Sequence, residues 1–130
     1  MKSSHILLVE DSILTEQLLR DGVQKIPFPL TLSSVATPQE AIEAIARNRP
    51  DIILLDVHLK GGSGFTVLRE AIKHEPRPTI VMVTNFALPP YRKYAMLSGA
   101  DYFLDKALNL DHVPTLVEWL VRKRFEATAP

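Results

Sequence analysis

Cysteine is absent from this chain of 130 residues, so the protein can form neither a disulfide nor a thiolate metal site. The absence is compatible with a reducing compartment. Charge of one sign is not in excess either, because 15 basic residues balance 15 acidic ones. Overall electrostatics therefore give no reason to expect binding to nucleic acid or to a membrane surface.

Long apolar runs are also missing. The first apolar run, residues 6–9, ends after four residues at Glu10, which is too short for the core of a signal peptide. No run approaches the roughly 20 residues that a membrane-spanning helix needs. With 46% hydrophobic residues, the chain can still bury a core of its own. These features predict a soluble, cytoplasmic protein with a single domain over residues 1–130.

Short apolar runs alternate with segments of helical periodicity, which is typical of βα units on a parallel sheet. The run at 30–36 alternates apolar and polar residues and predicts a half-exposed edge strand. Residues 52–55 are apolar throughout, which predicts a strand buried on both faces. The expected fold is α/β, with five βα units and strands at 6–9, 30–36, 52–55, 80–83 and 102–105.

The second helix has the clearest start signal. Thr37 can cap it, Pro38 suits its first position, and Glu40 completes a capping box. The fourth helix is expected to be short, at about 91–98, because two prolines directly before it should delay its start. The last helix is expected to begin near residue 111.

Polar side chains follow four of the expected strands. Glu10 and Asp11 follow the first strand, Asp56 the third, Thr84 the fourth and Lys106 the fifth. Open α/β sheets place their ligand sites at the carboxyl ends of the strands. Each residue alone could be an ordinary surface residue, but together they predict a site with acidic, hydroxyl and amine groups.

These residues resemble the receiver domain of bacterial two-component response regulators over nearly the whole chain. The resemblance implies a flavodoxin-like, doubly wound sheet with strand order 2-1-3-4-5, as in the chemotaxis receiver. If the sequence is the whole protein, we expect a stand-alone receiver of the chemotaxis-receiver type. The matching segments are residues 8–12 (LVEDS), Asp56 with Gly64, Thr84 after its aliphatic strand, and residues 99–106 (GADYFLDK).

In receivers, the aspartate after the third strand accepts a phosphoryl group from a sensor histidine kinase or a histidine phosphotransfer protein. Asp56 is the matching residue, and a carboxylate is a competent nucleophile toward phosphorus. The resemblance also implies a Mg²⁺ ion, which prefers oxygen ligands. Its protein ligands would be Glu10, Asp11, Asp56 and the backbone carbonyl of His58.

The resemblance assigns three more residues to the response. Lys106 is expected to pair with the phosphoryl group, which adds about −1.5 to −2 units of charge, and Thr84 to hydrogen-bond to it. Phe103 is expected to move together with Thr84. This switch would alter the surface of the last strand and of the fourth and fifth helices, where a downstream protein target is expected.

Three residues beside the site are expected to tune its chemistry. His58 and Phe86 occupy positions that tune phosphoryl lifetime in receivers, and a bulky aromatic ring should impede in-line attack by water. Asn85 is larger than the small residue common at its position, so it is expected to hinder access of the phosphodonor.

Two other functions remain open from the sequence. One is a pseudo-receiver, an interaction domain with the same fold that never accepts a phosphoryl group. The other is a Mg²⁺-dependent phosphohydrolase with an aspartate nucleophile, although Asp56-Val57-His58 lacks the second aspartate of such enzymes. We expect a signalling receiver and not an enzyme, either monomeric or weakly dimeric. Whether an output domain belongs to it is left open.

Overall fold

The computed structural model describes residues 3–127, so both ends of the predicted domain lie outside the described residues. Its centre is a five-stranded parallel sheet in the order β2-β1-β3-β6-β7. In chain order of these five strands, this is the predicted order 2-1-3-4-5, and the α/β class is confirmed. The strands are β1 (Ser4–Val9), β2 (Leu30–Val35), β3 (Ile52–Leu55), β6 (Thr79–Thr84) and β7 (Tyr102–Asp105).

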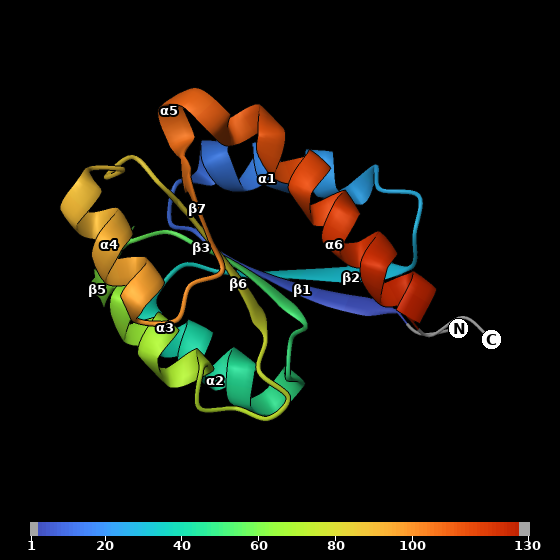
Figure 1. Cartoon of the computed structure of the whole chain (residues 1–130), viewed down its shortest axis with the longest axis horizontal. Coiled ribbons are helices and arrows are strands. Elements are labelled where there is room, and N and C mark those ends of the chain that lie inside the picture. The colour runs from blue at the N-terminus through green and yellow to red at the C-terminus, as the bar shows by residue number, and fades with distance from the viewer. Residues whose placement is uncertain (1–2, 128–130) are drawn as a thin grey trace.

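Helices cover both faces of this sheet (Figure 1). Helices α1 (Ile13–Gln24) and α6 (Val113–Ala127) lie on one face. The other face carries α2 (Pro38–Asn48), α3 (Gly64–Ala71) and α4 (Pro89–Leu97). The core therefore has two layers, and successive residues of β3 alternate between them. All four β3 side chains are at most 1% exposed, as the unbroken apolar run predicted.

The start of α2 follows the predicted capping box. The Thr37 hydroxyl accepts a hydrogen bond from the Glu40 N–H at 3.2 Å, and the Glu40 carboxylate accepts one from the Thr37 N–H at 3.2 Å. Pro38 is the first helical residue, where its missing N–H costs nothing.

The predicted start of α4 was wrong by two residues. The helix begins at Pro89 itself, with Leu88 before it as the capping residue. Proline is compatible with the first turn, because the N–H groups there have no partner within the helix. The two prolines therefore open the helix instead of delaying it.

Four short elements were not predicted. A small hairpin, β4 (His58–Leu59) with β5 (Gly62–Ser63), lies between β3 and α3. A short helix, α5 (Lys106–Asn109), and a single 3₁₀ turn (Leu110–His112) precede α6. The Asp105 carboxylate accepts a hydrogen bond from the Ala107 N–H at 2.8 Å, so helical structure starts directly after β7.

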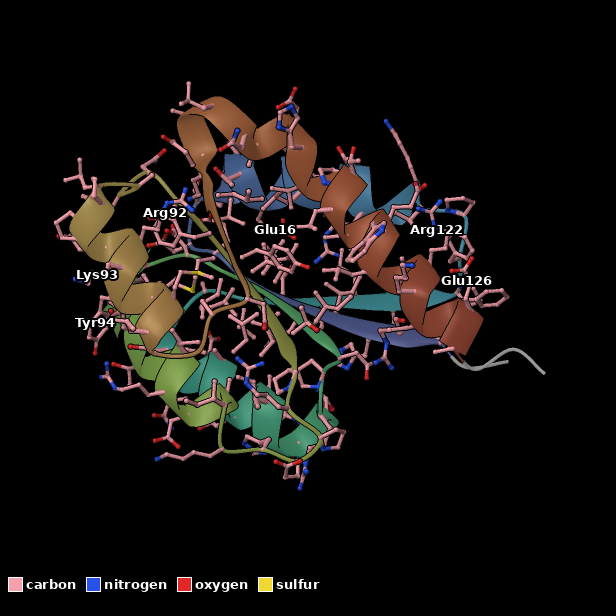
Figure 2. The ribbon with its side chains drawn as sticks, in the orientation of Figure 1. Glu16, Arg92, Lys93, Tyr94, Arg122 and Glu126 are labelled. Carbon is pink, nitrogen blue, oxygen red and sulfur yellow. The ribbon has the colours of Figure 1, made fainter. Side chains whose placement is uncertain are left out.

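A polar cluster joins α1 to β2. The Glu16 carboxylate lies 2.6 Å from Arg20 Nε and accepts the Ser34 hydroxyl at 2.9 Å. Partial burial opposes ionisation of Glu16, but the bonds from Arg20 and Ser34 outweigh it and hold the pKa of this carboxyl below its ordinary value of 4.5. Figure 2 shows Glu16 among the side chains between the sheet and the helices of this face.

Glu16→Gln is expected to lower the free energy of unfolding at pH 7 by about 0.5–1 kcal/mol, the usual size for a partly exposed pair. Because the folded-state pKa is depressed, the stabilisation is present above pH 4.5 and is lost as pH falls through the folded-state pKa. Urea unfolding at several pH values measures this. The exposed Glu43→Gln is the control, and an equal loss in both variants would contradict the expectation.

Within residues 3–127, no helix combines the length and apolar character that crossing a membrane requires.

Candidate functional site: the carboxyl ends of the strands

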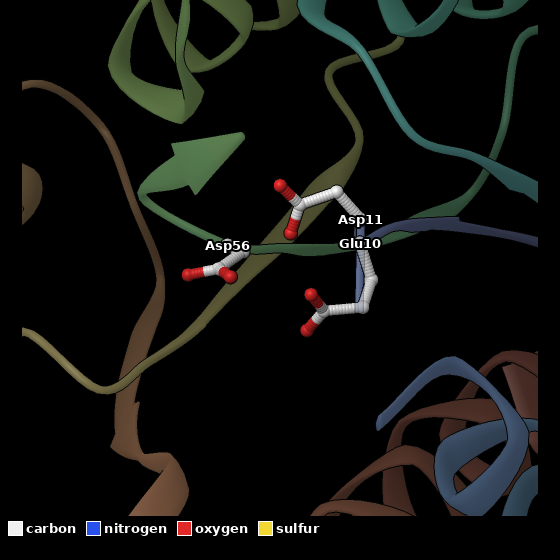
Figure 3. Close-up of side chains that lie close together, drawn as sticks. All are labelled: Glu10, Asp11 and Asp56. Atoms are coloured by element: carbon white, nitrogen blue, oxygen red, sulfur yellow. The ribbon is translucent and has the colours of Figure 1, made fainter. Parts of the chain in front are cut away.

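The predicted acidic residues meet at one edge of the sheet. Strands β1 and β3 are neighbours with Val9 opposite Leu55, so Glu10 and Asp56 leave the sheet side by side. Carboxylate oxygens of Glu10, Asp11 and Asp56 lie within 4.8 Å of one another. Figure 3 shows the three carboxylates facing a common space. Glu10 and Asp56 are buried, at 5% and 7% exposure, whereas Asp11 is exposed.

Lys106 reaches the same place from the end of β7. Its Nζ atom lies 2.8 Å from Asp56 Oδ2 and 2.5 Å from Glu10 Oε1. The lysine side chain is only 8% exposed. Burial opposes its charge, but the bonds to Asp56 and Glu10 prevail and hold the pKa of Lys106 above its ordinary value. Lys106 therefore bridges the two buried carboxylates as an ammonium ion.

The electrostatics of the cluster favour a hard cation. Burial raises the pKa of Glu10 above its ordinary value, although bonds from Lys106 and the Ser12 N–H oppose the rise. Three carboxyl groups share a small space with one ammonium group, so acidic groups outnumber basic ones there. Carboxylate oxygens are the donors that Mg²⁺ prefers, so the residues present fit such an ion.

The two predicted switch residues are both buried. Thr84, at the end of β6, is fully buried, and its hydroxyl oxygen accepts a hydrogen bond from the Phe86 N–H at 3.1 Å. Phe103 of β7 is 4% exposed and belongs to the core layer under α2, α3 and α4. The guanidinium carbon of Arg92 lies 5.0 Å from the centre of its ring.

The three predicted tuning residues are exposed and lie one or two residues after buried site residues. His58 in β4 follows Asp56 by two residues, and Phe86 follows Thr84 by two residues. The His58 and Phe86 rings are stacked, with centres 3.7 Å apart and planes at 24°. Asn85 is exposed. Loops from two neighbouring strands, β3 and β6, therefore meet through aromatic contact.

The sequence did not indicate the bond between Lys106 and Glu10, because Lys106 was expected to serve the phosphoryl group. The feature of the sequence that could have indicated this bond is the length of the glutamate side chain, which lets Glu10 reach across the strand ends. The sequence also did not predict the contacts of Tyr91, whose ring lies 6.4 Å from that of His58 and 6.1 Å from that of Phe86. No spacing in the sequence marks that contact.

Fold and site together define a class: a doubly wound α/β domain with a buried aspartate, an acidic pair and a lysine at the carboxyl ends of its strands. The family description "Response regulator receiver domain" matches residues 6–118. The chain belongs to this family of signalling domains.

Individual relatives agree with this membership. The regulatory protein LuxO of Vibrio cholerae is 33% identical over 116 residues, which cover 89% of this chain and 25% of that protein. A crystal structure of the signal receiver domain of a LuxO-type repressor from Vibrio parahaemolyticus has a TM-score of 0.82 at 26% identity, with 99% of this chain and 100% of that one covered. The Mn²⁺-bound response regulator Rcp1 has a TM-score of 0.78 at 22% identity, covering 90% and 91%. The chain thus spans about a quarter of the LuxO protein that it matches.

Proposed function

We propose that this chain is a phosphoacceptor receiver in which Asp56 takes a phosphoryl group from a sensor histidine kinase or a histidine phosphotransfer protein. The observation that carries the proposal is the Asp56 carboxylate. It is buried at the end of β3, lies 2.8 Å from the Lys106 ammonium and shares a space with Glu10 and Asp11. The proposal has three further parts. The chain is a single receiver domain over residues 1–130, and it acts as a signalling protein and not as an enzyme. It is located in the cytoplasm, where the kinase obtains its nucleotide.

In this reaction, an Asp56 oxygen forms a bond to phosphorus as the bond to the leaving group breaks. The leaving group is the imidazole nitrogen of a phosphohistidine or the carboxylate of acetyl phosphate. Phosphoryl transfer depends mainly on positioning and charge neutralisation. Lys106 is positioned to donate to a phosphoryl oxygen, and the Thr84 hydroxyl to donate once it turns from the Phe86 N–H.

Glu10, Asp11, Asp56 and the His58 carbonyl are the proposed ligands of Mg²⁺. When bound, Mg²⁺ would neutralise charge on the phosphoryl oxygens. The oxygen donor set supports this, as does the Mn²⁺ named for the similar Rcp1 structure. Phe103 is the proposed partner of Thr84 in the response, and His58, Asn85 and Phe86 are the proposed tuning residues.

The proposal is tested by intact mass after incubation with acetyl phosphate, with and without Mg²⁺. We expect a gain of one phosphoryl group that requires Mg²⁺ and is absent in Asp56→Ala. No gain in folded wild-type protein would favour the pseudo-receiver. A gain that survives in Asp56→Ala would place the acceptor elsewhere.

The proposed docking surface for the donor is the apolar outer side of α1. Ile13, Leu14 and Leu18 are 87%, 71% and 51% exposed, and Leu108 of α5 is 74% exposed. An adjoining groove of about 440 Å³ includes Leu18, Leu108 and Lys106 in its wall. Apolar side chains exposed together mark interaction surfaces. A donor seated there would lie next to the lysine of the site.

Leu14→Glu combined with Leu18→Glu is expected to slow phosphotransfer from the donor protein by roughly tenfold or more, as for loss of central interface residues. Phosphorylation by acetyl phosphate should stay unchanged, because both side chains point away from the core. Leu97→Glu, on 78%-exposed Leu97 of α4, is the control. The surface is misassigned if the control slows protein-to-protein transfer equally.

The proposed target-binding surface is on α4, β7 and α6.

A further inference from the structure

Three aromatic rings from separate segments meet at the rim of the site. They belong to His58 in β4, Phe86 in the loop after β6, and Tyr91 in α4. His58 and Phe86 are stacked with ring centres 3.7 Å apart. The Tyr91 ring lies 6.4 Å from His58 at 65° and 6.1 Å from Phe86 at 60°. Both Tyr91 pairs lie within the range of favourable aromatic contact, and the His58–Phe86 pair is stacked more closely.

Tyr91 is the anchored member of this cluster. Its side chain is partly buried and packs against the core layer beneath α4. Its ring is nearly parallel to that of Phe65 in α3, at 8° and 6.4 Å. Phe86 is 40% exposed and His58 is also exposed. Tyr91 therefore connects the two more exposed rings to the core layer.

The cluster is also tied to the residue proposed to sense the phosphoryl group. The Phe86 N–H donates to the Thr84 hydroxyl oxygen at 3.1 Å. If the Thr84 hydroxyl turns to a phosphoryl oxygen, the Phe86 N–H loses this hydrogen bond. Phe86 is then held by the contacts of its ring. The position of Phe86 in the phosphorylated protein then depends on His58 and Tyr91.

We propose that Tyr91 is a positioning residue that holds the stacked His58–Phe86 pair at the mouth of the site and so prolongs the life of the phosphoryl group. This inference rests on the proposed function of Asp56. In hydrolysis, a water oxygen bonds to phosphorus while the bond from phosphorus to the Asp56 oxygen breaks. The products are the Asp56 carboxylate and dihydrogen phosphate, which carries both water protons. The stacked rings restrict the space from which water can approach.

The test compares phosphoryl half-lives of the full chain. Protein is loaded with acetyl phosphate and Mg²⁺, freed of the donor, and followed by intact mass. Tyr91→Leu is expected to shorten the half-life by roughly three- to tenfold, the size expected when ring contacts of ordinary strength hold the pair in place. Tyr91→Phe keeps the ring and should retain the wild-type half-life. Tyr91→Met replaces Tyr91→Leu if the latter does not fold.

Tyr94 offers a matched control on the same helix. Its ring contacts Phe65 edge-on at 4.7 Å, and its hydroxyl accepts a hydrogen bond from Arg69 at 2.8 Å. Figure 2 shows Tyr94 at the outer side of α4. Tyr94→Leu should leave the half-life unchanged. Equal shortening by both substitutions would overturn the inference, because general loosening of α4 would then explain it.

A double substitution separates positioning from stability. Phe86→Leu alone should shorten the half-life, and adding Tyr91→Leu should shorten it little further, because Tyr91 acts through Phe86. Independent, multiplying effects would overturn the inference. Loading followed by identical decay in all variants would also overturn it, while leaving the phosphoacceptor proposal intact. Failure of the wild-type protein to load would count against the proposed function itself.

Discussion

Lys106→Met should destabilise the metal-free protein at pH 7 by about 2–4 kcal/mol, close to the usual cost of removing one partner of a buried ion pair. The lysine is 8% exposed and bridges the buried carboxylates of Glu10 and Asp56 at 2.5 and 2.8 Å. Without it, both carboxylates keep the cost of burial and repel each other. Methionine fills similar space without charge, so the loss reports mainly the missing ammonium.

Magnesium should bind the same variant more tightly, by at least about tenfold, because a positive charge a few ångströms from the ion is removed. Mg²⁺ should therefore raise the stability of Lys106→Met more than that of the wild-type protein. Urea unfolding with and without Mg²⁺ measures both effects. Phosphorylation should nevertheless slow, because the proposed partner of the phosphoryl oxygens is gone.

The control is Lys73→Met, which removes an exposed lysine paired with Glu70 at 3.0 Å. Exposed pairs contribute about 0–1 kcal/mol, so this variant should remain near wild-type stability and respond to Mg²⁺ as the wild-type protein does. A Lys106→Met protein that is equally stable, or that gains no extra stability from Mg²⁺, would show that the bridge is unimportant.

The sequence was most informative where one local rule decides the structure. The capping box at Thr37 and the apolar run 52–55 predicted α2 and β3, because helix caps and buried parallel strands have short, direct signatures. The meeting of Glu10, Asp56 and Lys106 followed from topology alone, since parallel strands end at one edge of the sheet.

What the sequence did not reveal depends on contacts between distant segments. His58, Phe86 and Tyr91 come from three separate elements, and no spacing marks their contact. The prolines before Tyr91 were ambiguous, because proline both ends helices and opens them. The hairpin after β3 pairs only two residues on each side, too few for a periodic pattern. The roles of the site residues stay predictions until they are measured.

Gly64→Ala should be the most damaging single-methyl change in this chain. A Cβ atom at this position would lie 1.9 Å from the backbone oxygen of Asp56 and 3.2 Å from Cα of Val57. The Gly64 N–H also donates to the Val57 carbonyl oxygen at 2.6 Å. These neighbours are backbone atoms of the segment that carries the proposed phosphoacceptor. They cannot move aside without moving Asp56.

We expect Gly64→Ala to lower the free energy of unfolding by about 3 kcal/mol, the upper part of the usual range for overpacking. In the protein that remains folded, phosphorylation by acetyl phosphate should slow by at least about tenfold, because small misplacements of reacting groups cost large factors in rate. Urea unfolding and the rate of mass gain measure the two effects separately. A Gly64→Ala protein within 1 kcal/mol of wild type would show that the hairpin relaxes freely.

Gly61 and Gly62 separate crowding from backbone conformation. Gly61 has open space around it but a φ of +84°, so Gly61→Ala should cost about 1–2 kcal/mol through left-handed backbone strain alone. At Gly62 a Cβ would lie 3.0 Å from Cγ of Pro38, which is a side-chain atom of a partly exposed residue and not backbone. Neither control touches the backbone of Asp56. Both should therefore accept a phosphoryl group at nearly the wild-type rate, and slowing confined to Gly64→Ala would identify contact with the Asp56 backbone as its cause.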